Sequence, residues 1–154
     1  MRLAEALLHR KELATRIKED IEALSTAVIT PDGLGPDEDP HALLRQIHTA
    51  QDDLEALVIR INRTNNRALT SGGLILMEAI AHRDMLSKRV EHLKELTKAI
   101  LGRNRRELWT DKAPIQTTHV SVESLRSKLN ASSQELRELD LAIQAANWAS
   151  ELLP

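Results

Sequence analysis

The residues best suited to chemistry in this sequence are polar side chains that interrupt an otherwise apolar helical pattern. If four helices run alternately up and down, most of these interruptions collect at one end of the bundle. Guanidinium groups bind planar anions such as carboxylate and phosphate, and amides can orient such a ligand. The interrupting residues are Arg10, Asn62, Arg63, Thr64, Asn65, Arg83, Asp84, Asp140, Gln144 and Asn147.

Two interpretations of this polar set stay open. In the first, ion pairs and asparagine hydrogen bonds fix the register of the helices, which is the best-attested role of buried polar groups. In the second, Arg63 and Arg83 form a fork that binds a small anionic ligand, and asparagine side chains orient it. The residues of this hypothetical ligand-binding site are Asn62, Arg63, Asn65, Arg83, Asp84, Asp140 and Asn147.

Three of the polar residues, Arg10, Thr64 and Arg83, fall on faces that we predict to be buried. A buried guanidinium is costly unless a carboxylate pairs with it. Both arginines should therefore have acidic partners nearby. The candidate partners are Glu5, Glu78, Asp84 and Asp140.

No metal site, cofactor site or catalytic residue is predicted. Glu5 precedes His9, and Glu78 precedes His82, by four positions each. Di-metal carboxylate bundles use Glu-x-x-His pairs with further carboxylates at the same depth, and such carboxylates are missing here. The acidic run at 37–39 suits a helix N-terminus better than a calcium loop. Whether the protein is an enzyme stays open, and the sequence favours that it is not.

Composition excludes several classes of function. The 154 residues carry a formal net charge of −2 and no cysteine. Disulfides, thiolate metal sites and cysteine catalysis are therefore excluded, and there is no electrostatic case for binding nucleic acid. No apolar run approaches the ~20 residues that span a bilayer, and the start of the chain lacks the pattern of a secretory signal. We expect a cytoplasmic protein without a membrane partner.

The fold class follows from the same composition. There is no Phe or Tyr and there are only two Trp, so the core must consist of Leu, Ile, Val, Ala and Met, which is typical of long packed helices. Proline and glycine divide the chain into four helical segments. We predict one all-α domain, residues 1–154, in which long antiparallel helices form a four-helix bundle or coiled-coil arrangement. The helices are expected at about 2–27, 41–69, 74–106 and 121–152.

The two middle helices should form a hairpin around which the chain is organised. Apolar or small residues recur in steps of four and three over 43–68 and again over 76–100, with Arg83 among the positions of the second helix. The link at 69–73 is so short that the second helix must return antiparallel to the first. β-prone residues at 28–30 and 116–120 allow a small two-stranded ribbon between the long connections.

The last helix carries two apolar stripes. One stripe, in steps of four and three over 125–150, can face the bundle. The other needs a further partner, which we expect to be a second copy of the chain. The residues of this second stripe are Leu141, Ala145, Trp148 and Leu152.

Several runs also carry a family resemblance. They are residues 3–7, 61–65, 78–84 and 135–140, together with Gln144, Asn147 and Trp148. In their order and spacing, over nearly the whole chain, they resemble a family of bacterial helical proteins labelled septicolysin-like. The resemblance implies a helical fold and no established activity.

A cytoplasmic structural or interaction protein that assembles with itself is the favoured function. The alternative is a small-anion-binding module or enzyme that uses the polar end of the bundle. A cytolysin, as the family label suggests, is disfavoured because the sequence has no secretion signal, membrane-length segment or thiol.

Overall fold

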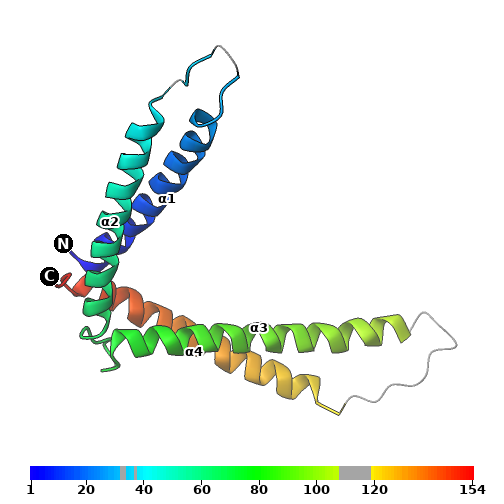
Figure 1. Ribbon diagram of the computed structural model, residues 1–154. Coiled ribbons are helices and arrows are strands. Elements are labelled where there is room, and N and C mark those ends of the chain that lie inside the picture. Colours follow the sequence, from blue (N-terminus) through cyan, green and yellow to red (C-terminus); the bar gives the residue numbers. More distant parts are fainter. Residues whose placement is uncertain (32–33, 37, 108–118) are drawn as a thin grey trace. The chain divides into compact units, whose positions relative to one another are not determined.

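The protein is all-α in the computed structural model, which describes residues 1–31, 34–36, 38–107 and 119–154, with the backbone alone for 103–107 (Figure 1). This confirms the predicted fold class of long antiparallel helices. The four helices are α1 (Leu3–Ala27), α2 (Pro40–Asn65), α3 (Leu76–Glu107) and α4 (Val122–Ala149).

The chain divides into two compact units. Unit 1 comprises Met1–Leu69 and Gln144–Pro154, and unit 2 comprises Thr70–Ile143. One boundary falls in the link between α2 and α3, and the other falls inside α4, which continues through it as a single helix. The predicted single domain and the predicted packing of α2 on α3 therefore stay predictions.

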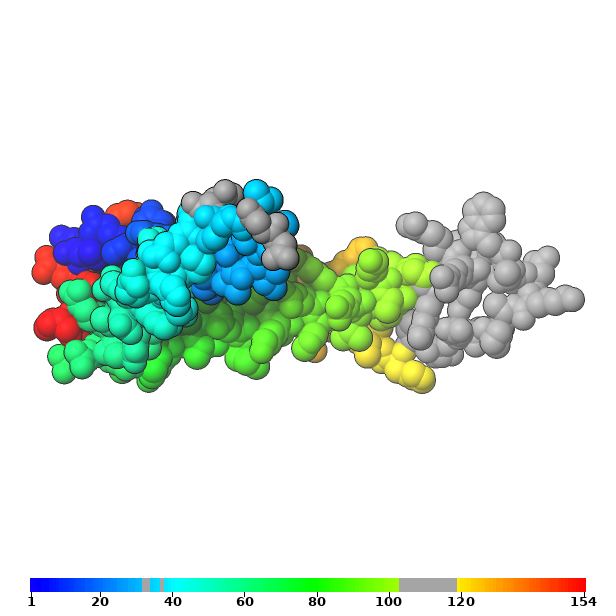
Figure 2. All heavy atoms as spheres, turned by 45° about the horizontal axis from the view of Figure 1, so that its top comes forward, coloured from blue at the N-terminus to red at the C-terminus, as the bar shows by residue number. Residues whose placement is uncertain are grey.

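Helices α1 and α2 pack side by side in unit 1 (Figures 1 and 2). Ile17 of α1 and Ile47 and Ala50 of α2 form a buried cluster, and the half-buried Leu24 and Leu54 pack against it. Apolar area removed from water stabilises a fold by about 25 cal/mol per Å². This shared apolar face is what holds the two helices together.

The buried face of α1 differs from the predicted one. Steps of four and three that begin at Leu3 predict Ile21 and Val28 inside, but these side chains are 45% and 61% exposed. The neighbouring Asp20 and Ala27 are half-buried instead. Asp20 faces α2 because the side-chain amide of Gln46 donates a 3.0 Å hydrogen bond to its carboxylate. Asp20 and Gln46 thus make a polar contact between α1 and α2 in a place where periodicity predicted apolar packing.

The predicted buried faces of the other three helices are confirmed. Every predicted position is buried or half-buried over 43–68 in and just after α2, over 76–100 in α3, and over 125–150 in and just after α4. In unit 2, α3 and α4 lie side by side, and His82 Nε2 of α3 is 3.5 Å from Glu135 Oε1 of α4. Steps of four and three were sufficient to find these faces.

Helix α2 begins as predicted but ends four residues early. The Asp39 carboxylate accepts a 3.0 Å hydrogen bond from the backbone N–H two residues later, which caps the helix start. At the other end, the carbonyl of Thr64 accepts hydrogen bonds from the backbone N–H groups of Arg67 and Ala68 at 3.0 and 2.8 Å. These bonds turn the chain out of the helix after Asn65.

The link between α2 and α3 closes in a tight turn at Gly73. This glycine has a φ of 80°, a conformation that side-chain-bearing residues rarely adopt. Its backbone N–H donates to the carbonyl of Thr70 at 2.9 Å, and the N–H of Thr70 donates to the carbonyl of Leu74, also at 2.9 Å.

The predicted β-ribbon is not found in the part of the chain that the structure describes. Residues 28–30 form no strand, and residues 116–118 lie outside the described residues. An isolated antiparallel bridge joins Arg2 to Glu151 instead, just beyond the end of α4. None of the described helices combines the length and the apolar character that crossing a membrane requires.

Candidate functional site

Three segments that are far apart in the sequence meet in unit 1. They are residues 1–3 at the start of α1, residues 60–64 near the end of α2, and residues 149–154, which end α4 and follow it. We call this site the clasp. Figure 2 shows its last segment, in red, beside the blue start of the chain.

On one side of the clasp, residues 150–152 pair with the start of the chain. The backbone N–H of Leu3 donates to the carbonyl of Ser150 at 3.0 Å, and that of Leu152 donates to the carbonyl of Met1 at 2.9 Å. The guanidinium of Arg2 donates to the last carbonyl of α4 at 2.8 Å. A cation at this position also complements the negative end of the helix dipole.

On the other side, residues of α2 hold the main chain of residues 153 and 154. The Thr64 hydroxyl accepts a 3.0 Å hydrogen bond from the backbone N–H of Leu153 and donates to the carbonyl of Arg60 at 2.8 Å. Arg60 Nε donates to the carbonyl of Leu153, and Arg63 Nη1 donates to the main-chain oxygen of Pro154, each at 3.0 Å. Two guanidiniums and one hydroxyl therefore bind backbone atoms only.

The clasp is also a place of deep burial. Leu3 is 0% exposed, Ile61 1%, Thr64 2% and Leu152 9%. Leu152 was predicted to belong to the exposed stripe of the last helix, but α4 ends at Ala149 and Leu152 is buried after it. Residues 150–154 are thus held in the clasp by main-chain hydrogen bonds and by the buried side chain of Leu152.

Four residues of the predicted ligand site belong to unit 1. Arg63 is engaged with Pro154, while Asn62 is exposed and Asn65 is half-buried. Asn147 is 5% exposed, and its Oδ1 has no hydrogen-bond partner among the described residues. A buried acceptor without a donor is costly, so Asn147 is the member of the predicted set that most needs a partner.

The other three residues of the predicted site belong to unit 2. Arg83 Nη2 and Nε lie 2.7 and 3.0 Å from Asp84 Oδ1, and Asp140 is exposed on α4. The Arg83 and Asp84 side chains are 35% and 57% exposed. Because Asp84 is the next residue of the same helix, this pair does not tie two helices together, and Arg83 is not a deeply buried guanidinium.

The predicted set is therefore divided between the units. The structure brings Arg83 and Asp84 together, and the fork of Arg63 with Arg83 stays a prediction. Arg10 was expected to be buried, which is wrong, because it is exposed on α1 and needs no buried carboxylate. Sequence reasoning missed Arg2 and Arg60, which donate hydrogen bonds to backbone carbonyls that no residue type reveals.

The two Glu–His pairs have other partners or lie exposed. The Glu5 carboxylate accepts a 2.7 Å hydrogen bond from the backbone N–H of Arg2 and so caps α1, while His9 is exposed. His82 approaches Glu135, and Glu78 is exposed. Within the described ranges, no group of three or more histidine, cysteine, aspartate or glutamate side chains could hold a metal ion.

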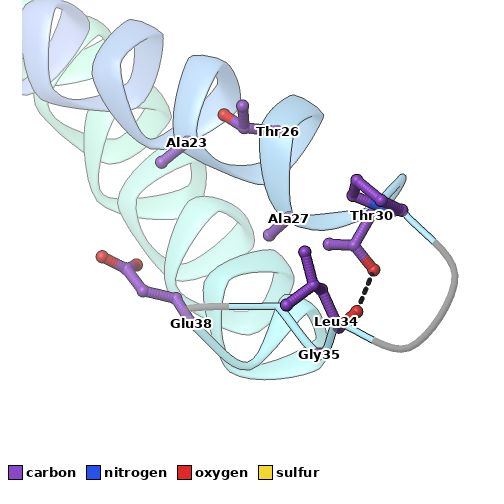
Figure 3. Close-up of a pocket in the computed structure, with 8 residues that line it drawn as sticks. Ala23, Thr26, Ala27, Thr30, Leu34, Gly35 and Glu38 are labelled. Atoms are coloured by element: carbon purple, nitrogen blue, oxygen red, sulfur yellow. Dashed lines mark hydrogen bonds between the residues drawn. The ribbon is translucent and has the colours of Figure 1, made fainter.

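A hollow of about 420 Å³ lies between the end of α1 and the loop that follows it (Figure 3). Ala23 and Ala27 form part of its wall on α1, and Leu34 and Glu38 line it from the loop. The Thr30 hydroxyl donates to the carbonyl of Leu34 at 2.8 Å and holds the loop folded back. Small side chains and one carboxylate provide no arrangement of acid, base and nucleophile.

The comparisons with known proteins concern the fold and the family. The chain is 31% identical to a functionally unknown conserved protein from Corynebacterium diphtheriae, whose crystal structure matches with a TM-score of 0.91 over 99% of each chain. No curated protein matches this chain. The resemblance to septicolysin-like proteins is wrong, because neither the matching family nor this relative points to septicolysin. The chain belongs to a family of unknown function, DUF6847, which it matches over residues 10–152.

Proposed function

We propose that this protein is a structural or interaction protein that works as an assembly of identical chains. The observation that carries the proposal is an exposed apolar stripe on α4. Leu141 is 71% exposed and Trp148 is 57% exposed, and Ala145 between them is exposed as well. Spacings of four and three place these residues on one face of the helix.

Grouped exposed apolar side chains support an interaction surface more strongly than scattered ones do. Single exposed leucines are common on protein surfaces, whereas contiguous apolar patches are usually covered by a partner. Tryptophan in particular is enriched at the energetic centres of interfaces. A second copy of the chain is the simplest partner, because most soluble assemblies consist of identical chains.

The compartment that we propose is the cytoplasm. The chain has no cysteine and so draws no stability from disulfides, which are the usual reinforcement of small secreted domains. Fractionation of cells that express the protein with a small epitope tag tests this assignment. Recovery in the secreted or membrane fraction would contradict it.

Sedimentation equilibrium tests the assembly. The unmodified chain should sediment at a multiple of its own mass, and the double variant Leu141→Gln/Trp148→Gln should shift to the mass of one chain. Leu8→Gln is the matched control, because Leu8 is 56% exposed on α1 with the charged Lys11 and Glu12 one turn away. A single-chain mass for the unmodified protein would overturn the proposal, and so would an unchanged mass for the double variant.

Ligand binding is a second candidate function, and Asn147 is the observation that favours it. The unpartnered atom is an oxygen, so the buried amide would accept a hydrogen bond from a donor group on the ligand. An anion would instead need the amide nitrogen of Asn147. Native mass spectrometry of protein purified without additives should then show a retained mass that is lost in Asn147→Leu. A clean chain mass, or a retained mass that the variant keeps, would contradict this candidate.

A further inference from the structure

We propose that residues 144–154 of one copy of the chain, which are the end of α4 and the arm 150–154 after it, pack against unit 1 of a second copy, so that two chains exchange these segments. The inference rests on the proposed self-assembly and names the surfaces that it uses. The receiving surface consists of residues 1–3 and 60–64, and the segment that it receives follows α4. Three observations support this exchange.

The first observation is how the chain connects the two sides of the clasp. Residues 1–69 and 144–154 together form unit 1, but the whole of unit 2 separates them in the sequence. Residues 144–154 are therefore held in unit 1 by non-covalent contacts, and the end of α4, with the buried Ala146 and Asn147, leads into the arm 150–154. The equivalent arm of a second chain presents the same atoms, which is the condition for exchange of an element between copies.

The second observation is the kind of contact that the clasp makes. Six hydrogen bonds between described residues join residues 149–154 to the receiving surface, at 2.8 to 3.0 Å. All six use main-chain atoms of residues 149–154. Leu152 is the one buried side chain within the arm, at 9% exposed. If residues 144–154 exchange together, the second copy supplies the same main-chain atoms, and all six hydrogen bonds are kept.

The third observation identifies the occupant as a second copy rather than an unrelated peptide. The receiving surface already holds this segment in the same chain, so the fit of sequence and geometry is established. Ala145 and Trp148 are exposed on the last two turns of α4, immediately before the arm. An arm from a second copy brings these apolar side chains with it to the other chain. The clasp and the part of the exposed stripe in unit 1, Ala145 and Trp148, thereby become parts of one interface.

The chain lacks cysteine, which makes exchange directly testable with a disulfide. Arg2 and Glu151 form an antiparallel bridge, and their side chains are 48% and 80% exposed. The hydrogen bonds of Leu3 and Leu152 flank this pair, so it is a non-hydrogen-bonded pair, with an expected Cα–Cα distance of about 4.5 Å. That distance lies within the range that a disulfide can bridge.

The experiment mixes two single variants, Arg2→Cys with ordinary isotopes and Glu151→Cys labelled with ¹⁵N, and oxidises the mixture. Exchange predicts covalent pairs that contain one chain of each kind, identified by their intermediate mass. The control mixes Leu8→Cys with labelled Glu151→Cys, because Leu8 is exposed but lies outside the clasp. Mixed pairs should be at least tenfold rarer in this control.

The outcomes separate this inference from the proposed function. Suppose that the double variant Arg2→Cys/Glu151→Cys closes its disulfide within one chain, and that the mixed variants give no covalent pairs. Exchange is then overturned, even if sedimentation still finds an assembly. Mixed pairs at the same yield as in the Leu8→Cys control would overturn it too. A single-chain mass for the unmodified protein would overturn both the exchange and the proposed self-assembly.

Discussion

Replacing Thr64 by valine should weaken the clasp while keeping the shape of the side chain. Thr64 is 2% exposed, and its hydroxyl is the only side-chain group of α2 that contacts the backbone N–H of Leu153 within the described residues. The same hydroxyl donates to the carbonyl of Arg60, one turn earlier in α2. Valine keeps the branched side chain but can neither accept nor donate a hydrogen bond.

The expected loss follows from the two bonds. The N–H of Leu153 is left without its acceptor in a part-buried site, which costs about 1–3 kcal/mol. The second loss costs little, because a carbonyl inside a helix also accepts from the backbone N–H four residues later. The added methyl group recovers at most ~0.8 kcal/mol through burial. We therefore expect the free energy of unfolding of unit 1 to fall by about 1–2 kcal/mol.

Urea denaturation followed by circular dichroism measures this loss, and amide hydrogen exchange at Leu153 locates it. Thr97→Val is the matched control, because the half-buried Thr97 of α3 donates to the carbonyl of Leu93 at 2.8 Å but accepts no bond from the clasp. Both substitutions remove a hydroxyl that bonds one helical turn back. If Thr64→Val costs no more than Thr97→Val and leaves the exchange of Leu153 unchanged, the clasp does not stabilise unit 1 as argued.

Three further predictions concern stability and are measured by thermal or urea unfolding. Ile61→Ala should lower the free energy of unfolding by about 2–5 kcal/mol, because Ile61 is 1% exposed. Ile21→Ala should lower it by less than ~1 kcal/mol, because Ile21 is 45% exposed. Equal losses would contradict the assigned face of α1. Gly73→Ala should destabilise the protein by about 1–2 kcal/mol, because Gly73 has a φ of 80°. Gly102→Ala should stabilise the protein by up to ~1 kcal/mol, because Gly102 lies inside α3 with open space around it. Changes of the same sign in the two variants would contradict this contrast. Arg83→Ala should lower the free energy of unfolding by less than ~1 kcal/mol, because the partner of Arg83 is the next residue of the same helix and both side chains are partly exposed. A loss of several kcal/mol would show that Arg83 is a buried residue that fixes helix register.

Much of the fold could be predicted because apolar spacing reports which helix face is buried. Spacing was misleading in α1, where Ile21 is exposed and Asp20 is half-buried against α2. Periodicity assigns a polar residue to solvent, and it has no means of knowing that Gln46 lies opposite and donates a hydrogen bond to it. The predicted end of α2 was too late for a related reason. Backbone hydrogen bonds at Thr64 end this helix before its apolar pattern ends.

The site was harder to predict than the fold. Arg63 and Thr64 stood out as polar residues on a helix of otherwise regular pattern, and both belong to the clasp. Their partners are main-chain atoms of residues 153 and 154, however, and every residue type carries those atoms. Side chains at the predicted ligand site could be named from the sequence, but a backbone segment that follows another helix could not be matched to them without the structure.

The division of α4 between the units has a consequence for how the chain folds as it is synthesised. Unit 2 is one continuous stretch, residues 70–143, and all of its parts are present as soon as that stretch has left the ribosome. Unit 1 begins first, but it lacks its last segment until residues 144–154 emerge. The receiving surface on the α1–α2 pair therefore stays unoccupied while the whole of unit 2 is synthesised. During that interval, the receiving surface around Leu3 and Ile61 is open to neighbouring nascent chains on the same messenger RNA.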